Sequence, residues 1–418
     1  MIALMLIGAV ALMAGIDGHA EEALSVQQVV DVALEVNPQV RAARARWLSA
    51  QHSIQQNYVP ADPQFLFTNG DSPTNPFANN LWQGFYFSEN FQFPGKAQLQ
   101  ADIARGSADI ARLTYQAVSR DIRAQAEIAY YQVVLDHALR KLNDENVAAL
   151  QEVLQVVKVA YSASQAAQSD FIAAEFNLAT AQQQADTLKV AEANDRTVLN
   201  QVLNREPDAP LPLQERLDLT ALTAREQNLA ARATYKRQEL LEAALAQRNS
   251  QKALSLAKLE YAPDFLFGYE YNNWDSRYAA PCATCVGTHN FFMGLNLPVF
   301  FWIKQKEDVK RAGYDLMAAR EDLSSVKTQT VAMVAQLYRQ TQLAYRMAVL
   351  YRDTLTPLAQ QGLKVALIAY QSAKIDFLTL TNAVQQTNSA KVSYVQAANQ
   401  FLAGKVALEQ AVGEPLSQ

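Results

Sequence analysis

Two cysteines and one histidine are the residues of this chain best suited to bind a ligand. Cys282 and Cys285 are its only cysteines, and His289 follows four residues after the second, in the stretch PCATCVGTH. Thiolates and an imidazole suit soft metal cations, whereas two thiols in an oxidising compartment form a disulfide. The choice between the two therefore depends on the compartment, which the rest of the chain must indicate.

No catalytic motif accompanies this group. The sequence contains no Ser-His-Asp order, phosphate-binding loop or dinucleotide-binding glycine pattern. Its 36 basic and 41 acidic residues give a net charge of -5, so no basic field exists to attract a nucleic acid. We expect neither an enzyme nor a nucleic-acid-binding protein, and no cofactor; any energy for its work must come from a partner.

The chain begins with an apolar segment that favours export from the cytoplasm. The run IALMLIGAVALMAGI is followed by Gly18-His19-Ala20, which is small at the two positions that a signal peptidase reads. We expect a signal peptide over residues 1–20, with a single membrane anchor as the alternative, although the run is shorter than the ~20 residues of a spanning helix. Beyond residue 20 no apolar stretch is long enough to span, so any membrane-crossing part must be β.

The rest of the chain, after residue 20, contains an internal repeat of two similar halves. Tyr161 in VAYSASQAAQSDFI corresponds to Tyr370 in IAYQSAKIDFLTL, an offset of 370 − 161 = 209 residues. A proline-rich seam, REPDAPLPL, forbids continuous helix between the two copies. We expect a first repeat over residues 21–209 and a second over 210–418.

Each half predicts the same order of a helix, a β-hairpin, a very long helix and a returning helix. Shorter helices are expected over 25–58 and 222–261. No proline occurs from 95 to 205, and only Pro357 occurs between 301 and 414. These proline-free runs predict long antiparallel helices.

Apolar residues in the first long run follow the spacing of a coiled coil. They are Ile128, Leu135, Leu139 and Leu142, at steps of 7, 4 and 3, and Leu150, Val153 and Val157, at steps of 3 and 4. The 67 residues from 95 to 161 would make a helix ~100 Å long. A coiled-coil scaffold would explain these helices, but not the stretches that interrupt them.

The interrupting stretches alternate in character with a period of two residues. They are QFLFTN at 64–69, GFYFSENFQF at 84–93, FLFGYEYNN at 265–273 and NFFMGLNLP at 290–298. The apolar faces carry Phe85, Phe87, Phe91, Phe93, Phe265, Phe267, Tyr269, Tyr271, Phe291, Met293 and Leu295. An apolar face backed by a small or polar face suits a β-strand between lipid and water. We expect these residues to face a membrane; for any one strand, a soluble hairpin packed on a core is the alternative.

Four strands cannot close a barrel with a usable lumen, and an open edge in lipid leaves backbone groups unpaired. Oligomerisation is therefore expected. Two copies would give 8 strands and a nearly filled barrel, whereas three would give 12 strands and leave room for a channel.

The tandem order of elements resembles the TolC outer-membrane efflux family. The most specific stretches are PLAQQGLKVALIAYQSAKIDFLTL, residues 357–380, and ENFQFPGK, residues 89–96. The second of these is similar to the strand-to-helix junction of the family's heavy-metal-cation branch.

The resemblance implies a mainly α fold with a membrane β part. Three copies would form a 12-stranded β-barrel in the outer membrane and an α-barrel tunnel of antiparallel coiled-coil helices in the periplasm. It also implies a passive channel that works with a periplasmic adaptor and an inner-membrane pump of the resistance-nodulation-division type. Heavy-metal cations are the expected cargo, with drug efflux and type I protein secretion as alternatives and a periplasmic scaffold as the non-transport alternative. The hairpin tip that carries Cys282 and Cys285 would face the cell exterior, so we expect a disulfide there, ahead of metal capture.

In the family, the tunnel tip lies at the turn after the tyrosines that correspond to Tyr161 and Tyr370. The turn glycines are replaced here by Ser164 and Ala373, and the two aspartates of the family's acidic constriction by Thr379 and Asn382. Asp376 is the nearest carboxylate, and Asp170 occupies the matching place in the first half. A ring of Asp376 or of Asp170 could line the pore; alternatively, each is a helix N-terminal charge stabilised by the backbone dipole.

Overall fold

A computed structural model describes residues 23–70, 82–214, 219–274, 287–372 and 374–416. The expected signal segment, Cys282, Cys285 and Ala373 lie outside these residues. The chain divides into two compact units. The helical unit comprises Met1–Arg41, Val118–Arg237 and Thr330–Gln418, and the sheet unit comprises Ala42–Ala117 and Gln238–Gln329. Each unit draws on both halves of the chain, and the proposed repeat boundaries stay a prediction.

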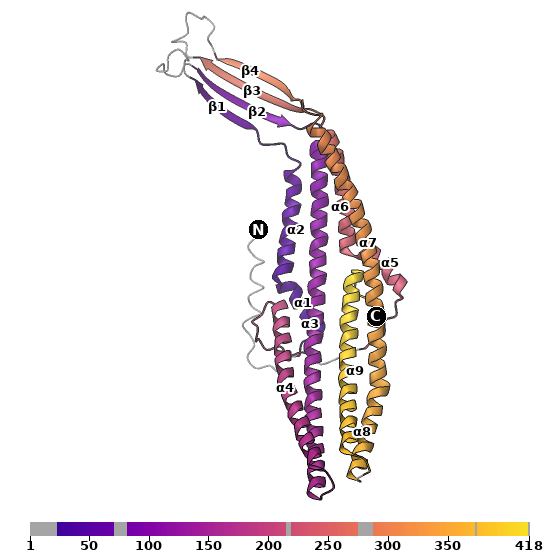
Figure 1. Cartoon of the computed structure of the whole chain (residues 1–418). Helices are drawn as coiled ribbons and strands as arrows, with labels where there is room; N and C mark the ends of the chain where they lie inside the picture. The colour runs from indigo at the N-terminus through magenta and orange to yellow at the C-terminus, as the bar shows by residue number, and fades with distance from the viewer. Residues whose placement is uncertain (1–22, 71–81, 215–218, 275–286, 373, 417–418) are drawn as a thin grey trace, which may run out of the picture. The chain divides into compact units, whose positions relative to one another are not determined.

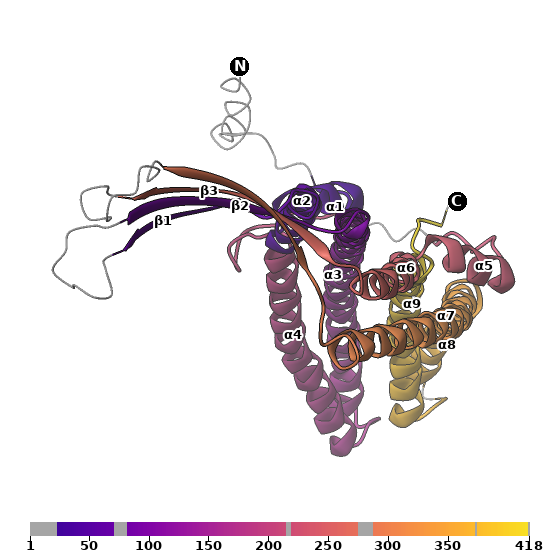
Figure 2. The same ribbon diagram turned by 90° about the horizontal axis from the view of Figure 1, so that it is seen from above.

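The sheet unit contains one antiparallel sheet of four strands in the order β1-β2-β3-β4. These are β1 (Gln64–Gly70), β2 (Trp82–Phe91), β3 (Asp264–Trp274) and β4 (Thr288–Asn296), and they lie side by side in one layer (Figure 1, Figure 2). The sequence predicted two matching hairpins, without saying which strands of the two would pair. The pairing of β2 with β3 joins them, so both halves of the chain build the same sheet.

The pairing register brings the predicted apolar faces of the strands together. Phe87 lies opposite Phe65 on one side and Tyr269 on the other, and Tyr269 in turn lies opposite Phe291. Because side chains alternate along each strand, this register places the apolar residues of all four strands on one face. Phe93 differs from the prediction in lying beyond the end of β2, where its ring stacks on Phe265 with a centroid separation of 6.3 Å.

The opposite face contains a close aromatic packing over a glycine. Phe292 lies across Gly268 on the neighbouring strand, where an added Cβ would come within 2.0 Å of the Phe292 ring. Phe292 also stacks on Tyr86 with a centroid separation of 5.2 Å. Gly268 therefore makes room for a ring that spans three strands.

The junction between β2 and the following helix is held by a buried lysine. The Lys96 Nζ donates hydrogen bonds to the Asp264 Oδ1 at 2.8 Å and to the Ala262 carbonyl oxygen at 2.9 Å, and it lies 3.4 Å from the Glu260 Oε2. The Asp264 carboxylate also accepts a bond from the Phe93 N–H. Gly95 supplies the left-handed backbone, φ +100°, that turns the chain into the helix.

Helices complete the sheet unit. They are most of α2 (Pro38–Gln56), the first part of α3 (Lys96–Ser162), α6 (Gln238–Leu259) and the first part of α7 (Lys304–Leu350). Trp47 on α2 stacks on Tyr115 of α3 with a centroid separation of 5.8 Å. On the other side of α3, the Asn249 amide of α6 bonds to the Ile103 carbonyl.

The helical unit consists of α1 (Val26–Val36), the later part of α3, α4 (Gln168–Val202), α5 (Glu226–Lys236), the end of α7, η1 (Tyr351–Leu355), α8 (Thr356–Gln371) and α9 (Phe377–Val412). The predicted coiled-coil residues Leu150, Val153 and Val157 are buried with residues of α4, α8 and α9. Ile128, predicted in the same seam, is instead 37% exposed. Among the described residues, no helix is both long and apolar enough to cross a membrane.

The two shorter helices that the sequence predicted are each broken in two. Asn37, between α1 and α2, has φ −65° and ψ 125°, and Arg237, between α5 and α6, has φ −65° and ψ 124°. At the first break, Pro38 excludes helical backbone at the residue before it. The second break has no proline; there the Arg237 backbone packs against Gly413, where an added Cβ would lie 2.8 Å from the Arg237 Cα.

The long helices differ between the halves because of one proline. α3 is continuous over 67 residues, the length expected from the sequence. Its counterpart runs from 304 to 371, 371 − 304 + 1 = 68 residues, but contains the wide π turn η1 directly before α8. Pro357 lacks an N–H and crowds the carbonyl four residues earlier, and a widened turn accommodates both effects.

Candidate functional site

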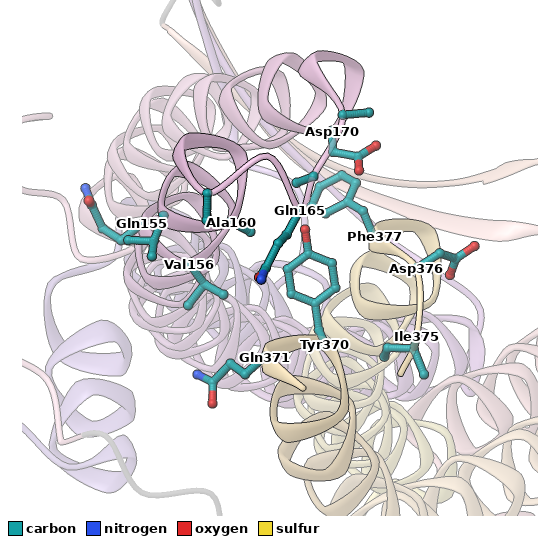
Figure 3. Close-up of a pocket in the computed structure, with 14 residues that line it drawn as sticks. Gln155, Val156, Ala160, Gln165, Asp170, Tyr370, Gln371, Ile375, Asp376 and Phe377 are labelled. Atoms are coloured by element: carbon teal, nitrogen blue, oxygen red, sulfur yellow. The ribbon is translucent and has the colours of Figure 1, made fainter. Parts of the chain in front are cut away.

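Two helix-to-helix turns of the helical unit carry the residues that the sequence singled out (Figure 3). The turn from α3 to α4 follows Tyr161, and the turn from α8 to α9 follows Tyr370. Both close with the same bond, since the Gln165 N–H reaches the Ala160 carbonyl and the Lys374 N–H reaches the Ala369 carbonyl, each at 2.8 Å. A bond of this span is the one that terminates helices in the Schellman motif.

Each tyrosine packs on a phenylalanine of the helix that returns. Tyr161 stacks on Phe171 with a centroid separation of 6.0 Å, and Tyr370 meets Phe377 edge to face at 6.3 Å. Phe377 is also part of the buried core beneath the turns. The aromatic pairs therefore fix both turns to the same packed helices.

Ser164 occupies the position in the first turn where the family resemblance implies a glycine. It has φ +58°, in the left-handed region that glycine adopts without cost and other residues adopt with strain. The turn therefore keeps the backbone of a glycine turn without the glycine.

A cavity of about 580 Å³ lies between the two turns. From α3, α4 and their turn it is lined by residues that include Gln155, Gln165 and Asp170, and from α8, α9 and their turn by Tyr370, Gln371 and Asp376 (Figure 3). The structure thus brings Asp170 to one cavity with Tyr370 and Asp376, which lie about 200 residues further along the chain.

Tyr370 and Asp170 influence each other electrostatically across this cavity. The Tyr370 ring points from α8 toward the α3–α4 turn, on the side of Asp170 (Figure 3). Burial raises the pKa of the Tyr370 hydroxyl, and the negative charge of Asp170 raises it further. The hydroxyl therefore stays protonated and can donate a hydrogen bond.

Asp376 and Asp170 differ in what their carboxylates do. Asp376 is the N-cap of α9, and its Oδ1 accepts a bond from the Thr379 N–H at 2.9 Å. Bonds from the Thr379 side chain and backbone lower the pKa of the Asp376 carboxyl. Asp170 lies in the first turn of α4, three residues after an N-cap alanine that makes no side-chain bond. The Asp376 carboxylate thus stabilises the start of α9 by a hydrogen bond and by its charge. Asp170 stabilises the start of α4 by its charge.

The two positions without the expected aspartates are both accessible. Thr379 and Asn382 are exposed on the first two turns of α9. Three glutamines that line the cavity, at 155, 165 and 371, were missed by the sequence reasoning. Nothing in their local sequence distinguishes them from the many other glutamines of the long helices.

The cysteine pair cannot be placed, because Cys282 and Cys285 lie outside the described residues. His289 is on the apolar face of β4, where its Nδ1 lies 2.6 Å from the Tyr269 hydroxyl oxygen. Over the described ranges, no three His, Cys, Asp or Glu side chains are grouped so that they could hold a metal ion.

Comparisons with known proteins agree with this architecture. Residues 215–414 match the family model described as Outer membrane efflux protein. No curated protein sequence matches the chain. A CusC crystal structure superposes with a TM-score of 0.81 at 14% identity, covering 96% of each chain. VceC from Vibrio cholerae gives 0.79 at 15% identity, over 94% of this chain and 97% of that one. The outer-membrane channel OprN gives 0.79 at 18%, over 94% and 90%.

At 14–18% identity, the structural superpositions establish only that this chain has the same fold as these proteins. The match to the family model adds information on function for residues 215–414. The chain matches the outer membrane efflux protein family over residues 215–414 and has the fold of TolC-type channels over almost its whole length, in agreement with the sequence resemblance. It is a non-enzymatic channel protein of the outer membrane with a periplasmic extension.

Proposed function

We propose that this protein is the passive exit channel of a tripartite efflux system and that it works as a homotrimer. The observation that carries the trimer is the four-stranded sheet. In one chain, β1 and β4 are its edges, and one face carries the exposed aromatic and aliphatic side chains of all four strands. An open edge in lipid costs several kcal/mol for each unpaired backbone group, and pairing between copies removes that cost. Three copies give 12 strands, enough to enclose a channel.

The partners follow from what the chain lacks in sequence. Without a nucleotide-binding loop, it must receive cargo from an energised protein of the inner membrane. A periplasmic adaptor and a pump of the resistance-nodulation-division type are the partners proposed. The turns around Tyr161 and Tyr370 are the proposed end that faces them.

The contact between Tyr370 and Asp170 is proposed to hold this end closed. The Tyr370 hydroxyl and the Asp170 carboxylate line one cavity from opposite turns and interact electrostatically, and a hydrogen bond between them would join the α8–α9 turn to the α3–α4 turn. Asp170 and Asp376 are proposed as the acidic residues at the constriction.

Tyr370→Phe should raise single-channel conductance in planar bilayers, whereas Tyr161→Phe, which keeps the stacking on Phe171, should leave it unchanged. Equal conductance of the two variants would contradict this closure.

Membrane fractionation combined with gel mobility tests the channel assignment. The protein should be found in the outer membrane and migrate in SDS as a trimer that heating converts to a monomer. A soluble, monomeric chain in the periplasm would end the assignment and favour the scaffold alternative.

Heavy-metal cations are the proposed cargo. The proposal rests on the junction ENFQFPGK and gains support from the carboxylates Asp170 and Asp376 at the tip, which three copies would multiply to six. Clustered negative charge raises the local concentration of cations. Deleting the gene should increase sensitivity to zinc or copper; increased sensitivity to drugs alone would replace metal by drug efflux.

A further inference from the structure

The segment that connects β4 to α7 exposes an unusual group of apolar side chains. Val299, Phe300, Phe301, Trp302 and Ile303 follow one another, and each is between 49% and 65% exposed. Phe301 lies between Tyr261 and Trp302, with centroid separations of 6.3 and 5.3 Å. Soluble surfaces rarely carry a contiguous patch of this kind, so the patch requires a partner.

The backbone of this segment already satisfies several of its own polar groups. The N–H groups of Val299, Phe301, Ile303 and Lys304 donate to carbonyls of Leu297, Pro298 and Phe300 at 2.9 to 3.1 Å. Backbone groups bonded in this way can enter an apolar medium at little cost, whereas unpaired ones cannot. The local turns therefore fit the segment to a lipid boundary.

Two lysines border the patch at the start of α7. Lys304 and Lys306 are exposed, and neither lies within ion-pair distance of an acidic side chain among the described residues, although the charge of Lys306 helps to lower the pKa of Glu307. The next basic residues along α7 are already paired, Lys310 with Glu307 at 2.8 Å and Arg311 with Asp308 at 3.2 Å. The patch thus combines aromatic rings with two positive charges available to an anion.

The corresponding junction of the first half has neither property. There the chain passes from Phe93 through a single proline and glycine into α3, and Lys96 is buried against Asp264 and Glu260. The aromatic and basic group is therefore not a requirement of the strand-to-helix connection. It is an addition specific to the second half.

We propose that Val299–Ile303, together with Lys304 and Lys306, is an interfacial anchor that binds anionic phospholipids at the periplasmic boundary of the outer membrane. The patch directly follows β4, whose exposed residues Phe291, Met293 and Leu295 are proposed to face lipid, so it continues the same surface. Tryptophan and tyrosine concentrate at the level of lipid headgroups, and lysines beside them reach the phosphates. This inference rests on the proposed function, since it requires the strands to be inserted in a membrane.

Tryptophan fluorescence tests the position of the patch. Trp47→Phe, Trp82→Phe and Trp274→Phe together leave Trp302 as the only tryptophan in the full-length protein, which is then reconstituted in vesicles of phosphatidylglycerol and phosphatidylcholine. We expect lipids brominated near the glycerol to quench Trp302 more strongly than lipids brominated near the chain ends. Equal quenching by both, or none by either, would overturn the anchor.

A second reporter separates failure of the anchor from failure of the channel proposal. Phe291→Trp, placed in a background in which Trp302 is also replaced by Phe, should be quenched by the deeply brominated lipid. Quenching of this reporter without quenching of Trp302 would assign the patch to a protein contact while the channel proposal stands. No quenching of either would count against both.

The charges are tested by lipid composition. Quenching of Trp302 by shallow bromines should be stronger when the brominated lipid is phosphatidylglycerol than when it is phosphatidylcholine. Lys304→Gln with Lys306→Gln should abolish this preference, whereas Lys310→Gln should retain it because that lysine is paired with Glu307. A preference that survives the double substitution would overturn the role of the two lysines.

Discussion

Ser164 is held in a backbone conformation that suits glycine. At φ +58° the Ser164 Cβ crowds the following carbonyl, which costs roughly 1–2 kcal/mol in the folded chain. A glycine would avoid this cost, but part of the gain would be lost because glycine is more flexible in the unfolded chain. We expect Ser164→Gly to stabilise the helical unit by about 0.5–1 kcal/mol. The midpoint of urea unfolding measures this, and Ser162→Gly, inside the last turn of α3, should instead lower it. A lower midpoint for Ser164→Gly would contradict the strain.

Lys96 holds the first strand-to-helix junction with contacts that no apolar residue can replace. Its ammonium is buried, whereas its partners Asp264 and Glu260 are partly exposed. Lys96→Met would leave Asp264 without its counter-ion, and we expect a loss of about 2–3 kcal/mol in the unfolding free energy of the sheet unit. Lys252→Met, which removes a longer and more exposed contact to Asp102, is the matched control. Similar losses for the two variants would show that burial of the Lys96 pair has no special role.

Between elements, α3 and α9 meet at a pair of carboxyl groups, Glu127 and Glu409. Burial raises the pKa of Glu127 from 4.5 to about 7, and Glu409 adds to the rise while Arg123 and Lys405 oppose it. The folded chain therefore holds a proton that the unfolded chain has released between pH 4.5 and about 7. The contribution of Glu127 to stability therefore falls as pH rises through this window and is constant outside it.

The expected result is a helical unit that is less stable at pH 8 than at pH 5, with about 1–2 kcal/mol of the difference due to Glu127 after allowance for solvent screening. Glu127→Gln should remove that share and raise stability at the higher pH. Part of the slope should remain, since burial and Asp195 also raise the pKa of Asp136 to about 7. Glu145→Gln, which removes a partly exposed pair with Lys391, should leave the slope unchanged. An unchanged slope in Glu127→Gln would refute the linkage.

At the scale of the whole molecule, the two faces of the sheet should respond differently to charge. Phe291 and Asn290 are neighbours on β4, both exposed, and they lie on the apolar and polar face respectively. A lysine on a lipid-facing side of a strand costs up to about 2–4 kcal/mol near the middle of the bilayer. We expect Phe291→Lys to reduce the SDS-resistant trimer in the outer membrane and Asn290→Lys to leave it intact. Equal trimer levels would mean that the apolar face does not meet lipid.

Local patterns in the sequence were enough for several parts of this fold. Period-two alternation identified the four strands and the residues that share a face, because side-chain direction along a strand depends only on neighbouring residues. The proline-free run predicted a very long helix, and the 67 residues counted from 95 to 161 equal the length of α3. The resemblance to the TolC family is supported by the match over 215–414 and by the fold of the whole chain, whereas the heavy-metal-cation branch stays a prediction.

Contacts between distant segments decided the rest. The break at Arg237 has no local signal, and there the backbone packs on Gly413, 176 residues further along (413 − 237 = 176). Likewise, the sequence named Asp170 and Tyr370 but could not place them at one cavity, and it could not pair β2 with β3. Periodicity specifies which side of an element is apolar, whereas the partner of that side depends on the packing of the whole chain. The sequence by itself therefore determined the helices and strands and the kind of protein. The tertiary structure decided which residues meet at the tip, and it showed that the apolar surface of Val299–Ile303 is exposed and available to a partner.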